Sequence, residues 1–185
     1  SIGETIVHAL ANEGAIPIIV CRNDRGYKYE KKLQNEGVDT TFVKTDLSNT
    51  NQIKKTAKII GEKYGKIDVL INNVGVNDGV GLGASIDDFM HSLQLNMVSY
   101  FAMTKYCLPY IKKAKGNILN IGSKVALTGQ GGTSGYAAAK GAILALTREW
   151  ALELLKYDIR VNAILPGEVM TPMYKQWASS FDNPD

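Results

Sequence analysis

The sequence has little of several features that mark special classes of protein. It contains only two cysteines in 185 residues, Cys21 and Cys107, too few for a disulfide framework and without metal-site spacing. We expect both to be small hydrophobic residues of the core. We expect no signal peptide, and no apolar run comes near the roughly 18 residues that a membrane span needs. These absences predict a reducing, aqueous compartment, the cytoplasm.

Excess charge is also scarce. Lysine and arginine number 21 against 18 aspartates and glutamates, and no basic cluster is dense enough to indicate a nucleic-acid surface. The densest group, Lys112, Lys113 and Lys115, ends a predicted helix, where cations complement the helix dipole. The composition is 45% apolar and 21% charged, as in ordinary globular domains. We therefore expect one domain over residues 1–185, with neither nucleic acid nor membrane as a partner.

The sequence does contain short strand-like runs alternating with longer helical patterns. Several runs are apolar on both faces, which is typical of parallel strands covered by helices on each side. The predicted strands are 16–21, 41–44, 68–72, 117–121 and 159–165. This alternation predicts an α/β fold with a doubly wound parallel sheet of Rossmann type.

Four helices are predicted between these strands. They cover residues 2–10, a segment around 53–60, a long stretch from Ser85 toward Ile111, and 136–156. The second has Ser48 or Asn49 as a good N-cap, and Ser85 with Asp88 forms a near capping box for the third.

The two ends of the sequence lack the elements that would complete this pattern. No strand precedes the first helix, and the last ten residues include Ser, Asn and Pro without a closing element. We therefore expect the sheet to lack its first strand, with two open edges, and to lack its C-terminal part. Residues 171–185 are predicted to form a mobile substrate lid. The alternative is a fragment that cannot fold alone.

Ser123, Tyr136 and Lys140 form the strongest chemical pattern. Tyr136 and Lys140 are four residues apart and share one helix face. An ammonium beside a phenol stabilises the phenolate, so we expect a lowered Tyr136 pKa and a proton-transfer role. Ser123 follows a strand at the carboxyl edge of the sheet, where ligands bind in open α/β folds. Alone, the Tyr–Lys pair could equally be an ordinary solvated pair.

These residues belong to a longer series that resembles the short-chain dehydrogenase/reductase family. The series is Asn72-Asn73-Val74-Gly75, Asn96, Ser123, Tyr136-Ala-Ala-Ala-Lys140, and Pro166-Gly167 with Thr171, in order over residues 1 to about 177. The resemblance implies a nicotinamide-dependent oxidoreductase that moves a hydride to or from a carbonyl.

The resemblance also implies a catalytic set of Asn96, Ser123, Tyr136 and Lys140. Tyr136 would be the general acid and base, Ser123 the ligand of the substrate oxygen, and Lys140 the modulator of the phenol and a ligand of the nicotinamide ribose. Asn96 would hold a water through its helix and connect Lys140 to solvent. Without the other motifs, Asn96 could simply satisfy a buried backbone group.

The cofactor implied by the resemblance is NADP or NAD. Only the end of the family's glycine-rich phosphate loop matches, at Ser1–Ile2–Gly3, before a helix whose N-terminus favours anions. Arg22 follows Cys21, where NAD-preferring relatives usually have aspartate, and this modestly favours NADP; Arg22 could also be a plain surface residue. The resemblance extends the cofactor-binding set to Ile2, Gly3, Arg22, Asn23, Asp46, Leu47, Asn73, Val74, Gly75, Tyr136, Lys140, Pro166, Gly167, Val169 and Thr171.

For the substrate, the loops resemble sugar-oxidising members, L-fucose dehydrogenases in particular. The matching segments are 77–82, 128–131, 147–150 and 167–174. The predicted substrate-binding residues are Asn77, Ser123, Lys124, Gln130, Tyr136, Glu168 and Trp177, although several could be solvated loop residues and Trp177 could pack on the core. The open alternatives are a carbonyl or 3-oxoacyl-thioester reductase and a non-enzymatic cofactor-binding scaffold. The resemblance further implies a homo-oligomer, a dimer or tetramer, and no metal.

Overall fold

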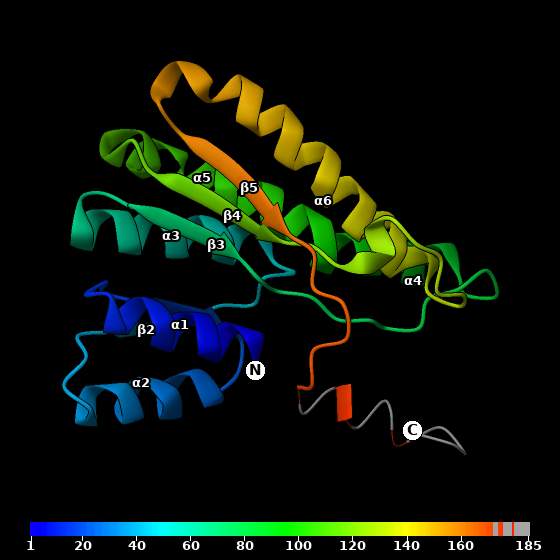
Figure 1. The fold of residues 1–185 in the computed structure, drawn as a ribbon, viewed down its shortest axis with the longest axis horizontal. Coiled ribbons are helices and arrows are strands. Elements are labelled where there is room, and N and C mark those ends of the chain that lie inside the picture. Colours follow the sequence, from blue (N-terminus) through cyan, green and yellow to red (C-terminus); the bar gives the residue numbers. More distant parts are fainter. Residues whose placement is uncertain (172–173, 176–178, 180–185) are drawn as a thin grey trace.

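The computed structural model describes residues 1–171, 174–175 and 179. Strands and helices alternate along this part of the chain (Figure 1). In order they are α1 (Ile2–Asn12), β1 (Ile18–Cys21), α2 (Arg25–Asn35), β2 (Thr41–Lys44), α3 (Thr50–Tyr64), β3 (Val69–Asn72), α4 (Ile86–Leu93), the π-helix η1 (Gln94–Val98), α5 (Ser99–Ala114), β4 (Asn117–Ile121), the 3₁₀ turn η2 (Lys124–Ala126), α6 (Ser134–Glu153), the 3₁₀ turn η3 (Leu155–Tyr157) and β5 (Arg160–Ile164).

The strands pair in parallel, but in two separate sheets. One contains β1 and β2, and the other has the order β3-β4-β5. No ladder joins β1 or β2 to β3 within the described residues. The predicted parallel α/β fold is confirmed, and the sheet is interrupted between β1–β2 and β3, where the missing strand was predicted.

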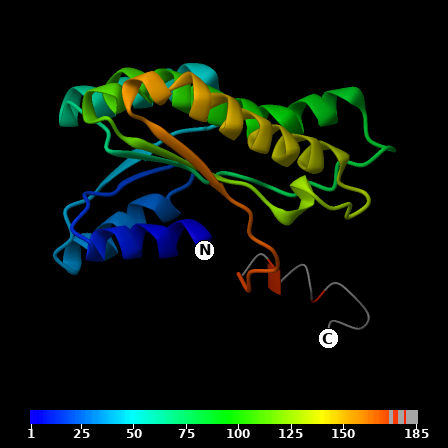
Figure 2. The same cartoon turned by 45° about the horizontal axis from the view of Figure 1, so that its top comes forward.

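Helices lie on both faces, as a doubly wound sheet requires. α3, α5 and α6 cover one face of the molecule, and α1 and α2 lie on the other (Figure 2). The prediction that strands are covered on each side holds only in part, because β3 and β5 have solvent-exposed apolar side chains. Val69 is 44% exposed and Ile164 is 51% exposed.

Local sequence explains where several helices begin. Asn49, one of the two predicted N-caps, accepts hydrogen bonds from the backbone N–H groups of Asn51 and Gln52. Ser85 and Asp88 form the predicted capping box at the start of α4. α2 was not predicted, because its sequence RGYKYEKKLQN is strongly polar and buries only Gly26 and Leu33.

The predicted long helix from Ser85 is one helical run with a π-turn in its middle. α4 passes directly into η1, which passes directly into α5. η1 contains Asn96, and Ser99 donates a hydrogen bond to the carbonyl of Leu95 at 2.6 Å. Such single π-turns occur often at functional sites. No helix in the described part of the chain is long and apolar enough to cross a membrane.

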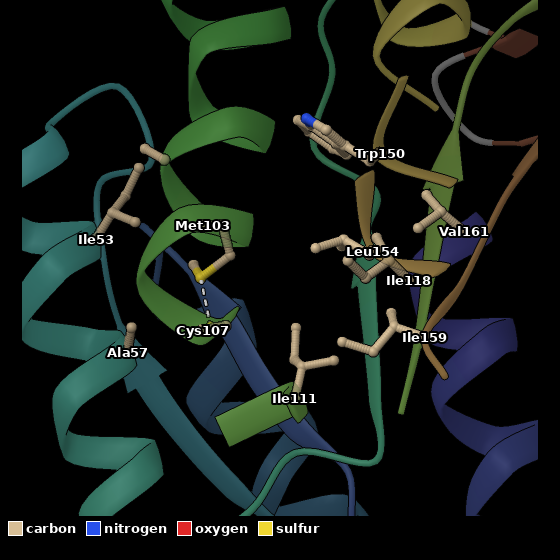
Figure 3. Close-up of a cluster of buried hydrophobic side chains, with 11 residues drawn as sticks. Ile53, Ala57, Met103, Cys107, Ile111, Ile118, Trp150, Leu154, Ile159 and Val161 are labelled. Atoms are coloured by element: carbon tan, nitrogen blue, oxygen red, sulfur yellow. Dashed lines mark hydrogen bonds between the residues drawn. The ribbon is translucent and has the colours of Figure 1, made fainter. Parts of the chain in front are cut away.

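The main hydrophobic core lies between α3, α5, α6 and the β3-β4-β5 sheet. Figure 3 shows Ile53 and Ala57 from α3 facing Met103 and Cys107 from α5, with β-strand and α6 side chains closing the cluster. Cys107 is buried as predicted, whereas Cys21 is partly exposed, and both are free thiols.

A buried polar network crosses the same sheet. The Asn72 side-chain amide donates to Thr104 at 3.1 Å and to Asn120 at 2.9 Å. Asn120 in turn donates to Thr147 at 3.0 Å. The network links β3 and β4 to α5 and α6, and it satisfies amides that would otherwise be costly to bury.

Candidate active site

The predicted cofactor and catalytic residues gather at the carboxyl ends of the strands. Most of these residues lie on the segment that follows a strand. They are Arg22 and Asn23 after β1, Asp46 and Leu47 after β2, Asn73 to Gly75 after β3, Ser123 and Lys124 after β4, and Pro166 to Val169 and Thr171 after β5. The first turn of α1, with Ile2 and Gly3, meets the segment after β3. A Cβ atom on Gly3 would lie only 2.9 Å from the Asn73 side-chain nitrogen.

Tyr136 and Ser123 are brought together as predicted. Tyr136 lies in the first turn of α6, and Ser123 is the N-cap of η2, immediately after β4. The Ser123 side chain lies near enough to the Tyr136 phenol to influence its pKa. Two hydroxyls able to contact one substrate oxygen therefore lie at the end of β4.

The electrostatics of Tyr136 differ from the prediction. Burial raises the pKa of Tyr136 above its usual value, and the nearby Ser123 side chain acts in the opposite direction. The predicted lowering by Lys140 is wrong. The Lys140 nitrogen lies 5.6 Å from the centre of the Tyr136 ring, and the desolvation of the phenol is the larger effect.

Lys140 is buried one turn further along α6, with 2% of its surface exposed. Its ammonium donates to the carbonyl of Ile121 at 2.8 Å and to the hydroxyl of Tyr100 at 3.2 Å. Burial lowers the pKa of Lys140 to about 8. A Cβ atom on Gly75 would lie 3.2 Å from the Lys140 nitrogen, so the segment after β3 passes close to the ammonium.

Tyr100 is a site residue that the sequence prediction missed. It is fully buried, and its hydroxyl contacts Lys140, the backbone after β3 and the last residue of β4. The available signal was its position one helical turn after Asn96, on the same helical run.

Asn96 is fully buried in the π-turn and contacts the backbone after β3. Its side-chain oxygen accepts a hydrogen bond from the Val76 N–H at 2.8 Å. Its nitrogen donates to the Val76 carbonyl at 3.1 Å and to Ser92 at 3.3 Å. The side chain thus performs the backbone-satisfying role that was the structural alternative, and it fixes the segment next to Gly75.

Arg22 and Asp46 lie close together at the ends of β1 and β2. Hydrogen bonds from Ser48 are the main cause of the lowered Asp46 pKa, and the positive charge of Arg22 contributes to it. Arg22 itself is exposed. Its guanidinium is therefore accessible to a ligand, with the Asp46 carboxylate partly balancing its charge.

The predicted substrate residues are brought together only in part. The Lys124 N–H donates to the Pro166 carbonyl at 2.9 Å, and the Lys124 ammonium forms an ion pair with Glu168. Asn77 and Gln130 are exposed, on the segment before α4 and the segment before α6. Gly81 packs against Gly132, so these segments are neighbours. Trp177 and most of the predicted lid 171–185 lie outside the described residues.

Known proteins provide an independent comparison. The family model described as short chain dehydrogenase matches residues 1–181. The chain is 32% identical to the L-fucose dehydrogenase of Bos taurus over 187 residues, covering 99% of this chain and 67% of that protein. It is 33% identical to the 3-oxoacyl-[acyl-carrier-protein] reductase FabG of Chlamydia pneumoniae, covering 93% of this chain and 71% of that protein. The chain thus spans about two thirds of the length of these relatives.

Solved structures agree on the fold. A crystal structure described as Cj0485 dehydrogenase is 46% identical and superposes with a TM-score of 0.90 over 99% of this chain and 70% of its own. An alcohol dehydrogenase of Thermococcus sibiricus, complexed with 5-hydroxy-NADP, is 28% identical with a TM-score of 0.85, over 92% and 73% of the two chains. With its matching family model, relatives and folds, the chain belongs to the short-chain dehydrogenase family of oxidoreductases.

Proposed function

We propose that this chain oxidises a hydroxyl of an aldose similar to L-fucose, with a nicotinamide dinucleotide as the hydride acceptor. The observation that carries the proposal is the arrangement of Tyr136, Ser123 and Lys140 at the end of β4. A half-buried phenol, close to a serine hydroxyl and one helical turn from a buried ammonium, suits proton exchange with a substrate oxygen.

In this reaction Tyr136 and Ser123 act on the same substrate oxygen. The substrate C–H bond breaks with its electron pair leaving as hydride, and the O–H proton passes to the phenolate form of Tyr136 as the C=O bond forms, which gives the neutral phenol. Ser123 holds the substrate oxygen beside the phenol. When bound, the nicotinamide ring supplies the carbon that accepts the hydride. The same groups serve the reverse reduction, in which Tyr136 returns the proton.

Lys140 and Asn96 have supporting roles in this proposal. Lys140 is placed to bind ribose hydroxyls where Gly75 leaves room, and its positive charge favours the phenolate of Tyr136 once the site is filled. The side chain of Asn96 is engaged with Val76. A water that links Lys140 to solvent would therefore bind the main-chain carbonyl of Asn96.

The residues present fit a dinucleotide. Gly3 and Gly75 are positions where a Cβ atom would crowd Asn73 and Lys140, so glycine there lets a ligand approach the backbone closely. Asp46 and Leu47 would contact the adenine. Arg22 would pair with a 2′-phosphate, which favours NADP, while its neighbour Asp46 keeps NAD use open.

Support for a sugar comes from the polar groups beside Ser123 and from the similarity to L-fucose dehydrogenases. Lys124 and Glu168 offer a donor and an acceptor at the ends of β4 and β5. Sites that hydrogen-bond substrate hydroxyls discriminate strongly, because an unpaired polar group in a closed site is costly. Asn77, Gln130 and Trp177 complete the proposed substrate set.

We expect turnover of L-fucose when the purified chain is mixed with aldoses and NADP or NAD and reduced nicotinamide is followed by absorbance. The kcat/KM for oxidation of the aldose should exceed the kcat/KM for reduction of a 3-oxoacyl thioester by at least about 10-fold, since one lost polar contact costs that much. D-Arabinose, which shares ring stereochemistry with L-fucose and lacks its methyl group, is the matched substrate control. Turnover of the thioester without turnover of any aldose would contradict the sugar proposal and favour the reductase alternative.

The chain is also proposed to form a homo-oligomer through its long helices. Met90 on α4, Phe101 on α5 and Leu152 on α6 are 57%, 46% and 73% exposed, which is unusual for large apolar side chains on covering helices. We expect sedimentation equilibrium to give a mass of two or four chains at micromolar concentration. A mass of one chain at every concentration would rule this assembly out.

A further inference from the structure

Lys140 is a buried cation held mainly by uncharged groups. Its pKa is shifted by burial, and no charged partner contributes to the shift in the described part of the chain. An isolated buried ammonium is unfavourable unless hydrogen-bond acceptors replace the lost water. The two acceptors bonded to it, the Ile121 carbonyl and the Tyr100 hydroxyl, therefore determine how easily it stays protonated.

Tyr100 contributes the only side-chain acceptor bonded to this ammonium among the described residues. Its hydroxyl lies 2.9 Å from the Val74 carbonyl and 2.9 Å from the Ile121 carbonyl. A phenol has one proton, so it donates to one of these carbonyls at a time while its oxygen accepts from Lys140. Burial raises the pKa of Tyr100 far above its usual value, so the phenol stays neutral.

These contacts use two of the three N–H groups of the ammonium. The acceptors lie at the end of β4 and on α5, whereas Gly75, on the segment after β3, has no side chain to crowd the nitrogen. The third N–H is thereby left for a ligand. The position of the Tyr100 hydroxyl determines the direction in which the third N–H of Lys140 points.

We propose that Tyr100 is a positioning residue of the active site, whose hydroxyl holds the Lys140 ammonium against β4 and reserves one N–H for the ribose of the nucleotide. The inference rests on the proposed function of Lys140. The competing interpretation is that Tyr100 only fills the core and ties the segment after β3 to β4.

Few titratable groups surround Lys140, so the effect of the Tyr100 hydroxyl on the Lys140 pKa can be measured by itself. The titratable groups that face it are two phenols, Tyr100 from α5 and Tyr136 from α6. β4 and the segment after β3 face it with backbone groups, and the neutral amide of Asn96 in η1 borders the same glycine, Gly75. A change in the Lys140 pKa on removal of one hydroxyl can therefore be assigned to that hydroxyl.

The test is Tyr100→Phe, which keeps the buried ring and removes the hydroxyl. The ligand-free chain is labelled with ¹³C at lysine Cε and titrated by NMR, and Lys140 is identified by the signal lost in Lys140→Met. We expect the Lys140 pKa to fall by about one pH unit, because a hydrogen bond to a charged group is lost. The NADP dissociation constant should rise about 10-fold for the same reason.

Tyr106→Phe is the matched control, since Tyr106 is a half-buried phenol on the same helix. It should leave both readouts unchanged. If Tyr100→Phe lowers only the melting temperature, with the Lys140 pKa unaltered, Tyr100 is structural and the proposal is overturned.

A measurement on the unaltered chain covers the case in which Tyr100→Phe does not fold. With tyrosine labelled at ¹³Cζ, one buried phenol should respond to pH with the midpoint of Lys140; no such response would also overturn the proposal. Neither NMR experiment depends on substrate. A failure of the aldose assay with an intact Lys140 response would therefore count against the proposed function alone.

Discussion

Replacement of Tyr136 by phenylalanine is expected to lower kcat by about 1000-fold, while the dissociation constant of NADP changes by less than about 2-fold. The substitution removes the phenol oxygen that exchanges the proton and keeps the ring that packs in the first turn of α6. Ser123 remains to bind the substrate oxygen, so KM should change little. Steady-state kinetics with L-fucose, together with a fluorescence titration of NADP, measure the two quantities.

Tyr27→Phe is a suitable control for this experiment, because Tyr27 is an exposed phenol on α2. It should retain full activity. Retention of more than about a tenth of the turnover by Tyr136→Phe would remove Tyr136 from its proton-transfer role, since general acid–base catalysis contributes far more than that. Loss of NADP binding alongside turnover would instead indicate a folding defect.

Lys140→Met should have two effects of opposite sign, a loss of turnover of at least about 100-fold and a gain in stability. The Lys140 pKa is lowered from 10.5 to about 8 in the folded chain. Below pH 8 both states carry the charge and the folded state bears its full desolvation cost, roughly 3 kcal/mol. Between pH 8 and 10.5 the unfolded state holds the extra proton, so stability rises with pH.

The measurement is the free energy of unfolding against pH for the two proteins. Lys140→Met should be more stable by up to about 3 kcal/mol at pH 7, reduced by the lost hydrogen bonds. The advantage should decrease steadily from pH 8 and be gone near pH 10.5. Lys54→Met, at an exposed position of α3, should show no such dependence. Parallel curves for Lys140→Met and the unaltered chain would refute the argument.

Much of the fold was predictable because it depends on local patterns. Strands β2 and β4 have the predicted boundaries, since short β-branched runs ended by polar residues specify them. The caps at Asn49 and Ser85 were likewise local. α2 was missed because most of its stability comes from tertiary packing, through Leu33 and the close approach of Gly26 to Phe42, rather than from an apolar stripe.

The sequence predicted which residues lie at the site better than it predicted their pKa shifts and contacts. Helical spacing and strand ends placed Ser123, Tyr136 and Lys140 together. The direction of the Tyr136 pKa shift was wrong, because it depends on burial, which spacing does not give. The contact of Tyr100 with Lys140 joins residues 40 apart in the sequence. The substrate loops are exposed segments whose side chains have few constraints, so Asn77 and Gln130 stayed predictions.

The buried amides of β3 and β4 have a consequence for how the sheet assembles. Asn72 pairs with Asn120 in the ladder, and their side chains are hydrogen-bonded to each other. A slip of two residues would keep every side chain on its own face, so hydrophobic patterning alone does not prevent it. The same slip would place Asn72 opposite Ile118 and break the buried hydrogen bond between the two amides, at a cost of about 1–3 kcal/mol. The asparagine pair therefore specifies the register of β3 against β4, because it stabilises the observed pairing relative to the pairing that is shifted by two residues.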